Sequence, residues 1–176
     1  MKQTAFGNVK IYDTNISFEQ IYNKEYIPKE YIDDIKKANL LIIPNEDFRD
    51  EGDILFPETT REFYDYIREN ANDDIVADIA ISDEDFQRIE LHSAVFEVAP
   101  IIIQYGLLPI ATSIIGSFLY ELAKKHHRKP EDTTAKVKII TEETKSKKCK
   151  TITYEGPVSG IKEALDEAAK DIFSKD

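Results

Sequence analysis

The chain has 176 residues, a net charge of −11 and a single cysteine. A domain of this length buries enough apolar surface to be stable without disulfides or a structural metal, so we expect one domain over residues 1–176. The lone Cys149 excludes an internal disulfide, and no Cys or His pairs occur at metal-ligand spacing. Residues 1–7 lack the apolar run of a secretory signal. We therefore expect a cytoplasmic protein without a cofactor or metal ion.

Charge is divided unevenly along the sequence. Residues 1–92 carry 22 acidic and 10 basic side chains, a net of −12, whereas residues 93–176 carry 12 and 13, a net of +1. Residues 124–150 hold ten Lys or Arg against four acidic side chains. The acidic part argues against broad nucleic-acid binding, but the basic stretch suits an acidic partner or a phosphate group. The simpler interpretation is that this stretch neutralises the acidic part or solvates a hairpin.

The acidic part predicts short strands that alternate with helices. The apolar run at 40–43 is typical of a strand covered on both faces. Thr59 and Glu62 offer a capping box for a helix, and Ser82 with Asp85 offers a second N-terminal cap, before Phe86 and Ile89. Strands are expected at 9–12, 40–43 and 75–81, and helices at 16–22, 28–37, 59–70 and from 82 onward.

An uncharged stretch runs from Val98 to Tyr120. As one helix it is just long enough to span a bilayer core of about 30 Å. Two prolines with Gly106 between them instead favour two helices joined near residues 105–108, that is, a buried helical hairpin. The second piece begins at Pro109 and ends in a basic cluster at 124–129, which suits the negative end of a helix dipole and also a positive-inside membrane flank.

The C-terminal part predicts a β-hairpin followed by a helix. Apolar and polar residues alternate over 136–141 and again over 150–155, with a turn around 144–148. Gly156 and Pro157 end the second strand. Apolar residues then recur at three- and four-residue steps from Val158 to Ile172, giving a helix with one apolar face that must pack on the hairpin. The fold class is α+β: a small mixed sheet with helices, a long apolar helical segment and a C-terminal ββα unit.

Candidate catalytic groups are scattered. The glycines never reach the spacing of a phosphate-binding loop. Cys149 lies on a hairpin that is expected to be exposed, among lysines that lower a thiol pKa, but it has no histidine nearby in the sequence. His126 and His127 are adjacent, so on a helix they point in different directions and are better suited to a helix end than to one metal ion. The carboxylates at 46–53 and at 83–85 are interpreted as a solvated loop and as helix-dipole compensation, and Asp78 as an outward-facing strand residue with a site role as the alternative.

Three short motifs carry a resemblance over residues 98–173. They are Leu119-Tyr120-Glu121-Leu122, the strand 136–140 and Tyr154-Glu155-Gly156-Pro157. With the apolar helical segment before them and the amphipathic helix after them, this part is similar to the effector-associated constant components, small accessory proteins encoded beside bacterial conflict effectors. The resemblance implies a non-catalytic partner in an anti-phage or toxin-type system, and it supplies no catalytic residues.

These observations predict a non-enzymatic adaptor subunit of a multi-component bacterial defence system. Its partner is expected to be a protein, an effector or ATPase encoded nearby, with a homo-oligomer as an alternative. Two other hypotheses are an acidic inhibitor or immunity protein for a basic toxin, and a membrane-associated sensor with 98–120 in lipid. Adjacent apolar residues in the uncharged stretch are more than one helix stripe can fully bury, so we expect them to contact a partner together with the basic residues that follow. The candidate partner-binding residues are Ile101, Ile102, Ile103, Ile114, Ile115, Phe118, Lys124, Lys125, Arg128 and Lys129.

Overall fold

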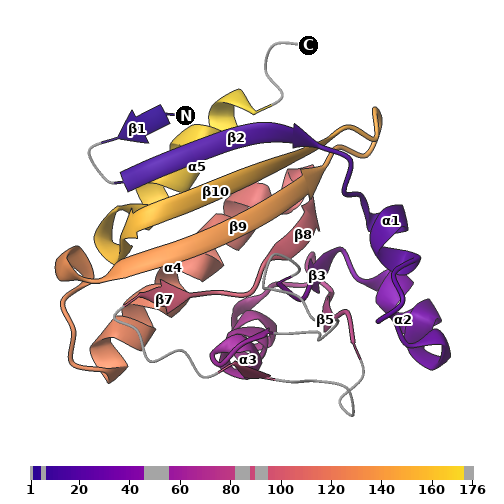
Figure 1. Ribbon diagram of the computed structural model, residues 1–176, viewed down its shortest axis with the longest axis horizontal. Coiled ribbons are helices and arrows are strands. Elements are labelled where there is room, and N and C mark those ends of the chain that lie inside the picture. Colours follow the sequence, from indigo (N-terminus) through magenta and orange to yellow (C-terminus); the bar gives the residue numbers. More distant parts are fainter. Residues whose placement is uncertain (1, 5–6, 46–55, 82–87, 90–94, 173–176) are drawn as a thin grey trace.

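A mixed β-sheet organises the chain (Figure 1). The computed structural model describes residues 2–4, 7–45, 56–81, 88–89 and 95–172. Within them the sheet contains β1 (Lys2–Thr4), β2 (Gly7–Thr14), β3 (Leu40–Ile42), β5 (Ala77–Ile79), β7 (Phe96–Glu97), β8 (Ile101–Gln104), β9 (Thr134–Glu142) and β10 (Cys149–Pro157). The order is β1-β2-β10-β9-β8-β3-β5, and β7 pairs with β9 beside this path. Strands from the acidic part and from the C-terminal part therefore interleave in one sheet.

The centre of this sheet is apolar on both faces. Alternate residues of a strand point to opposite faces. Accordingly, Ile101 and Ile103 of β8 join one apolar cluster and Ile102 joins the other. β8 is parallel to β9 and antiparallel to β3, so it is flanked on both sides. This environment explains why strands here are uninterrupted apolar runs.

Helices cover both faces of the apolar centre. Helices α3 (Thr60–Asn70), α4 (Leu108–Lys125) and α5 (Ile161–Asp171) contribute to the larger cluster, with α4 and α5 behind the strands in Figure 1. Helices α1 (Phe18–Tyr22) and α2 (Ile32–Lys37) cover the opposite face. Short 3-10 turns precede or link them: η1 (Lys29–Tyr31), η2 (Tyr105–Leu107), η3 (Pro130–Asp132) and η4 (Val158–Gly160).

The outer strands present a polar face on the side away from α4 and α5. Val9, paired with Tyr154, belongs to the core on the helix side. The alternate residues Lys10 and Tyr12 are exposed, and Tyr12 retains 45% of its accessible surface. The sheet thus passes from a doubly covered centre to an edge region with one solvated face.

The α+β class and the C-terminal ββα unit are confirmed. The predicted hairpin is the antiparallel pair of β9 and β10, in which Ile152 lies opposite Ile139. The buried side of α5 includes Ile161, Leu165 and Ala168, as the periodicity predicts. At the end of β10 the Tyr154 hydroxyl donates to the carbonyl of Pro157 at 2.6 Å, which ties the strand to the turn before α5.

Three local predictions are wrong. The first piece of the uncharged stretch is β8 rather than a helix, so no helical hairpin forms. Thr59 gives no side-chain cap to α3, because its hydroxyl instead donates to the carbonyl of Glu97 at 3.0 Å. Residues Arg88–Ile89 form β6, which pairs in parallel with β4 (Phe56–Pro57) in a second small sheet, where a helix was expected. The rest of that expected helix lies outside the described residues.

Candidate binding surfaces

The six apolar candidates for partner binding all lie inside the protein. Ile102 and Ile103 are fully buried between strands, and Phe118 packs against Phe63 with ring centroids 5.2 Å apart. The prediction that these side chains contact a partner is therefore corrected: they build the core of their own chain. The exposed fractions are 1% or less for Ile101, Ile102 and Ile103, and 7%, 2% and 4% for Ile114, Ile115 and Phe118.

The segment Tyr105–Lys125 has the length and apolar composition of a membrane-crossing helix. In the fold its apolar side serves the core, where Ala111, Ile115 and Leu119 face the sheet cluster. Thr112 is also fully buried, and its hydroxyl donates to the Asp166 carboxylate of α5 at 3.0 Å. Packing against the sheet and α5 is sufficient to explain the composition of this helix.

The basic candidates Lys124, Lys125, Arg128 and Lys129, called here the basic cluster, are all exposed. They surround the C-terminus of α4, which ends in a Schellman motif. The Arg128 amide donates to the Ala123 carbonyl at 2.8 Å, and the His127 amide donates to the Lys124 carbonyl at 3.1 Å. His127 occupies the left-handed position of the motif with φ of 55°, where glycine is usual. The two histidines thus form a helix end, as their adjacency indicates.

An aromatic side chain fixes this helix end to the sheet. Phe96 of β7 is buried, its ring lies 5.7 Å from the His126 ring, and the Arg128 guanidinium lies 5.4 Å from its centroid. Arg128 therefore has its charge held over an aromatic face. Lys125 forms an ion pair with Glu62 of α3 at 3.5 Å. Phe96 was missed from the sequence because nothing local distinguishes it from other apolar residues.

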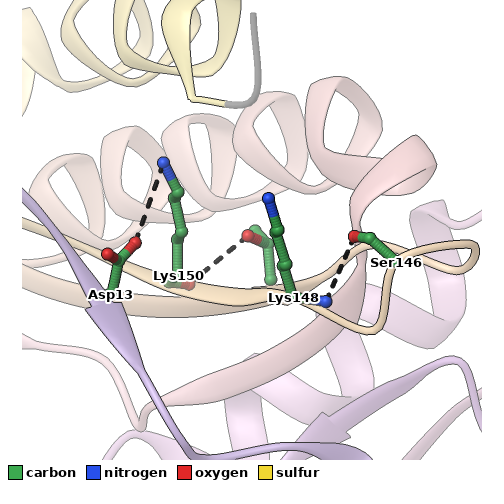
Figure 2. Close-up of polar contacts among 5 residues, drawn as sticks. Asp13, Ser146, Lys148 and Lys150 are labelled. Carbon is green, nitrogen blue, oxygen red and sulfur yellow. Dashed lines mark hydrogen bonds and ion pairs between the residues drawn. The ribbon is translucent and has the colours of Figure 1, made fainter. Parts of the chain in front are cut away.

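The turn between β9 and β10 and the start of β10 carry a second group of basic residues, the lysines at 145, 147, 148 and 150 (Figure 2). The Lys150 ammonium lies 3.8 Å from the Asp13 carboxylate, which links β10 to β2. The Lys148 amide donates to the Ser146 hydroxyl at 3.2 Å, and the Lys148 and Lys150 side chains project to the same side in Figure 2. Lys147 has a φ of 59°, consistent with a tight turn. Part of the hairpin charge is thus neutralised within the chain.

Cys149 lies beside this turn but is buried, contrary to the exposed position expected for it. Burial raises the pKa of its thiol to about 11, with the Glu142 carboxylate contributing in the same direction and Lys147 opposing both. The Glu142 carboxylate accepts from the Phe18 amide at 3.0 Å and lies 3.8 Å from the Cys149 sulfur. The expected effect of the lysines on this pKa is therefore overridden. A cavity of about 1150 Å³ opens here between α1, α2 and the hairpin turn.

A second hollow, of about 450 Å³, lies on the polar face of the sheet. Burial raises the pKa of the Glu97 carboxyl, while Lys136 opposes that change. The Glu97 carboxylate accepts a hydrogen bond from the side-chain amide of Asn45 at 3.1 Å. Lys136 forms an ion pair with Glu155 of the neighbouring strand at 3.7 Å. Lys136 therefore interacts with both carboxylates that line this hollow.

The remaining candidate site residues have structural roles or lie outside the described residues. The carboxylate clusters at 46–53 and 83–85 lie outside them. Asp78 of β5 is half-buried, and its carboxylate accepts from the Ile79 amide at 2.8 Å. Among the described residues, no three His, Cys, Asp or Glu side chains are arranged to hold a metal ion. Comparison of the chain with protein-family models, curated proteins and solved structures gives no match.

Proposed function

We propose that this protein is a non-enzymatic accessory subunit of a multi-component bacterial defence system, and that it binds another protein through the basic cluster. The observation that supports this most directly is the fixed backbone that carries Lys124, Lys125, Arg128 and Lys129 around one Schellman motif. The resemblance of residues 98–173 to effector-associated constant components supplies the setting. The partner surface is expected to be acidic.

Rigidity is the reason this cluster is favoured over the hairpin turn. The backbone of α4 next to the cluster is anchored by the buried residues Leu122 and Ala123, and Phe96 holds the chain just beyond the helix. A pre-organised surface loses little conformational entropy on binding, so more of its electrostatic attraction appears as affinity. A net charge of −11 for the whole chain makes this local positive field selective for a partner that carries a complementary acidic patch.

The test is co-purification of the protein with each product of its neighbouring genes, expressed together, at low and at high salt. Changing all four residues of the basic cluster to Ser should abolish the low-salt complex and flatten its salt dependence, because exposed ionic contacts are screened over about 8 Å at physiological salt. A control with the same change in charge replaces four exposed lysines elsewhere: Lys29, Lys145, Lys162 and Lys170.

The control variant should retain the complex. Equal loss of binding in both variants would show that only net charge matters, and unchanged binding in the first variant would contradict the proposed interface. Thermal unfolding of both variants separates a binding effect from a folding effect. Each removed charge at the helix end is expected to lower stability by at most about 0.3–1 kcal/mol.

A further inference from the structure

Helices α3 and α4 enclose a groove of about 720 Å³ that the basic cluster does not use, apart from Lys125 at one end. Its floor is aromatic and aliphatic. Phe118 and Leu122 of α4 line it, and the Tyr66 ring lies 5.4 Å from the Phe118 ring at a tilted angle of 58°. Phe118 and Leu122 are each only 4% exposed, so the groove follows a well-packed seam between two helices.

The rim of the groove is acidic. Glu62, Asp65 and Glu69 of α3 lie three and four residues apart, so they form one stripe along the helix, about 10 Å long at a rise of about 1.5 Å per residue. Glu121 of α4 lines the same groove. All four carboxylates are exposed. Their spacing follows the direction of the groove.

A cation from the same chain already occupies one end of this rim. The Lys125 ammonium lies 3.5 Å from the Glu62 carboxylate, and this contact joins α4 to α3. Within the described part of the chain, Asp65, Glu69 and Glu121 form no ion pair. Three carboxylates beside an apolar floor suit lysine or arginine side chains, whose aliphatic stems cover apolar surface while their charged ends reach the rim.

We infer that the groove between α3 and α4 binds a basic, amphipathic segment of a partner protein, with apolar side chains against Phe118, Leu122 and Tyr66 and cations against Asp65, Glu69 and Glu121. This surface is opposite in sign to the basic cluster, and the inference does not depend on that cluster. Charge complementarity selects the occupant: an acidic or uncharged segment would leave the carboxylates unpaired beside apolar surface.

The binding probe is a dye-labelled helical peptide with arginine and leucine on one face, titrated with the full-length protein and followed by fluorescence anisotropy. A second peptide carries glutamate in place of each arginine. The variant Asp65→Asn/Glu69→Gln/Glu121→Gln keeps side-chain shape and removes three charges. We expect it to weaken binding of the arginine peptide by about tenfold, since each exposed ionic contact contributes modestly. The glutamate peptide should not bind.

Two further variants sharpen the result. Glu25→Gln/Glu30→Gln/Asp33→Asn removes three exposed carboxylates from the region of α1 and α2, and should change affinity by less than about twofold. Lys125→Gln removes the competing cation at Glu62 and should tighten binding of the arginine peptide, whereas it should weaken the complex formed through the basic cluster. Failure of one proposal is thereby distinguishable from failure of the other.

Equal binding of both peptides, or equal loss in the groove variant and its control, would overturn the inference. Analytical ultracentrifugation of wild type and groove variant addresses a second copy of this chain as the occupant. Self-association that the groove substitutions abolish would assign the groove to that copy and would likewise overturn binding of a basic segment.

Discussion

Replacement of glycine by alanine should have opposite effects on stability at Gly116 and at Gly7. Gly116 lies in the middle of α4, where it is buried against the start of α5. A methyl group there would lie 3.4 Å from Cβ of Lys162 and 3.8 Å from Cγ2 of Ile161, which is ordinary van der Waals contact. Alanine exceeds glycine in helix propensity by about 1 kcal/mol. Gly116→Ala should therefore stabilise the protein by about 1 kcal/mol, although this position lies in a helix contact.

Gly7 differs in both conformation and space. Its φ is 149°, and a methyl group would lie 2.9 Å from the backbone oxygen of Glu155 and 2.9 Å from Cα of Gly156. Backbone atoms of a paired strand cannot move aside cheaply, so Gly7→Ala should destabilise by about 2 kcal/mol.

Urea unfolding followed by circular dichroism measures both changes, and a thermal melt of Gly116→Ala should rise by about 2–4 °C. Loss of more than about 1 kcal/mol in Gly116→Ala would show that α4 and α5 cannot accommodate the methyl group, and would refute this reasoning about their separation.

Three further predictions concern the core, the buried thiol and a buried carboxyl. Ile161→Asp places an unpaired carboxylate at a fully buried position and should destabilise by about 4 kcal/mol in urea unfolding, whereas the exposed neighbour Lys162→Asp should change little. Cys149, with a thiol pKa of about 11 against an ordinary value of 9.0, should react with iodoacetamide at neutral pH about 100-fold more slowly than an unhindered cysteine, and reaction at the free rate would contradict its burial. Burial raises the pKa of Glu97, so the folded state holds the proton of this carboxyl more tightly than the unfolded state does. The stability that this proton contributes is lost as pH rises from the ordinary pKa of 4.5 through the raised pKa of the folded state. Glu97→Gln should thus gain stability relative to wild type between about pH 4 and pH 7, and a constant difference across that range would argue against the raised pKa.

Local periodicity was enough to predict the elements that pack through one regular face. The hairpin of β9 and β10 has alternating residues, and α5 has apolar residues at helical spacing, so each element reveals its buried side without knowledge of its neighbours. β3 was predicted for a related reason, since a short apolar run stopped by Pro44 is typical of a strand buried on both faces.

The choice between helix and strand was ambiguous where a short apolar run had no periodicity. Ile101, Ile102 and Ile103 fit a buried helix as well as a buried strand, and the two prolines with Gly106 between them favoured two helices, which was the wrong choice. The decisive constraint is not local: β3 and β9 leave a gap in the sheet that only a strand can fill. The same error placed Ile101, Ile102 and Ile103 in the apolar partner site, because their side chains are buried in two clusters on opposite faces of β8. The other three apolar candidates lie on α4, where the larger cluster buries them.

The fold brings together the acidic and basic regions that are separate in the sequence. A net of −12 before residue 93 and of +1 after it indicates two separate regions, but α3 of the acidic part packs against α4 of the other part. The acidic rim and the basic cluster therefore lie next to each other, and they meet at the ion pair of Lys125 with Glu62. A partner that docks on the basic cluster competes with Glu62 for Lys125. A groove partner with one further cation that reaches Glu62 competes with Lys125 for that carboxylate. Each partner breaks the ion pair of Lys125 with Glu62 and leaves the other residue of that pair free, so occupation of one surface should favour occupation of the other. The coupling free energy cannot exceed the strength of one exposed ion pair, about 1 kcal/mol at most.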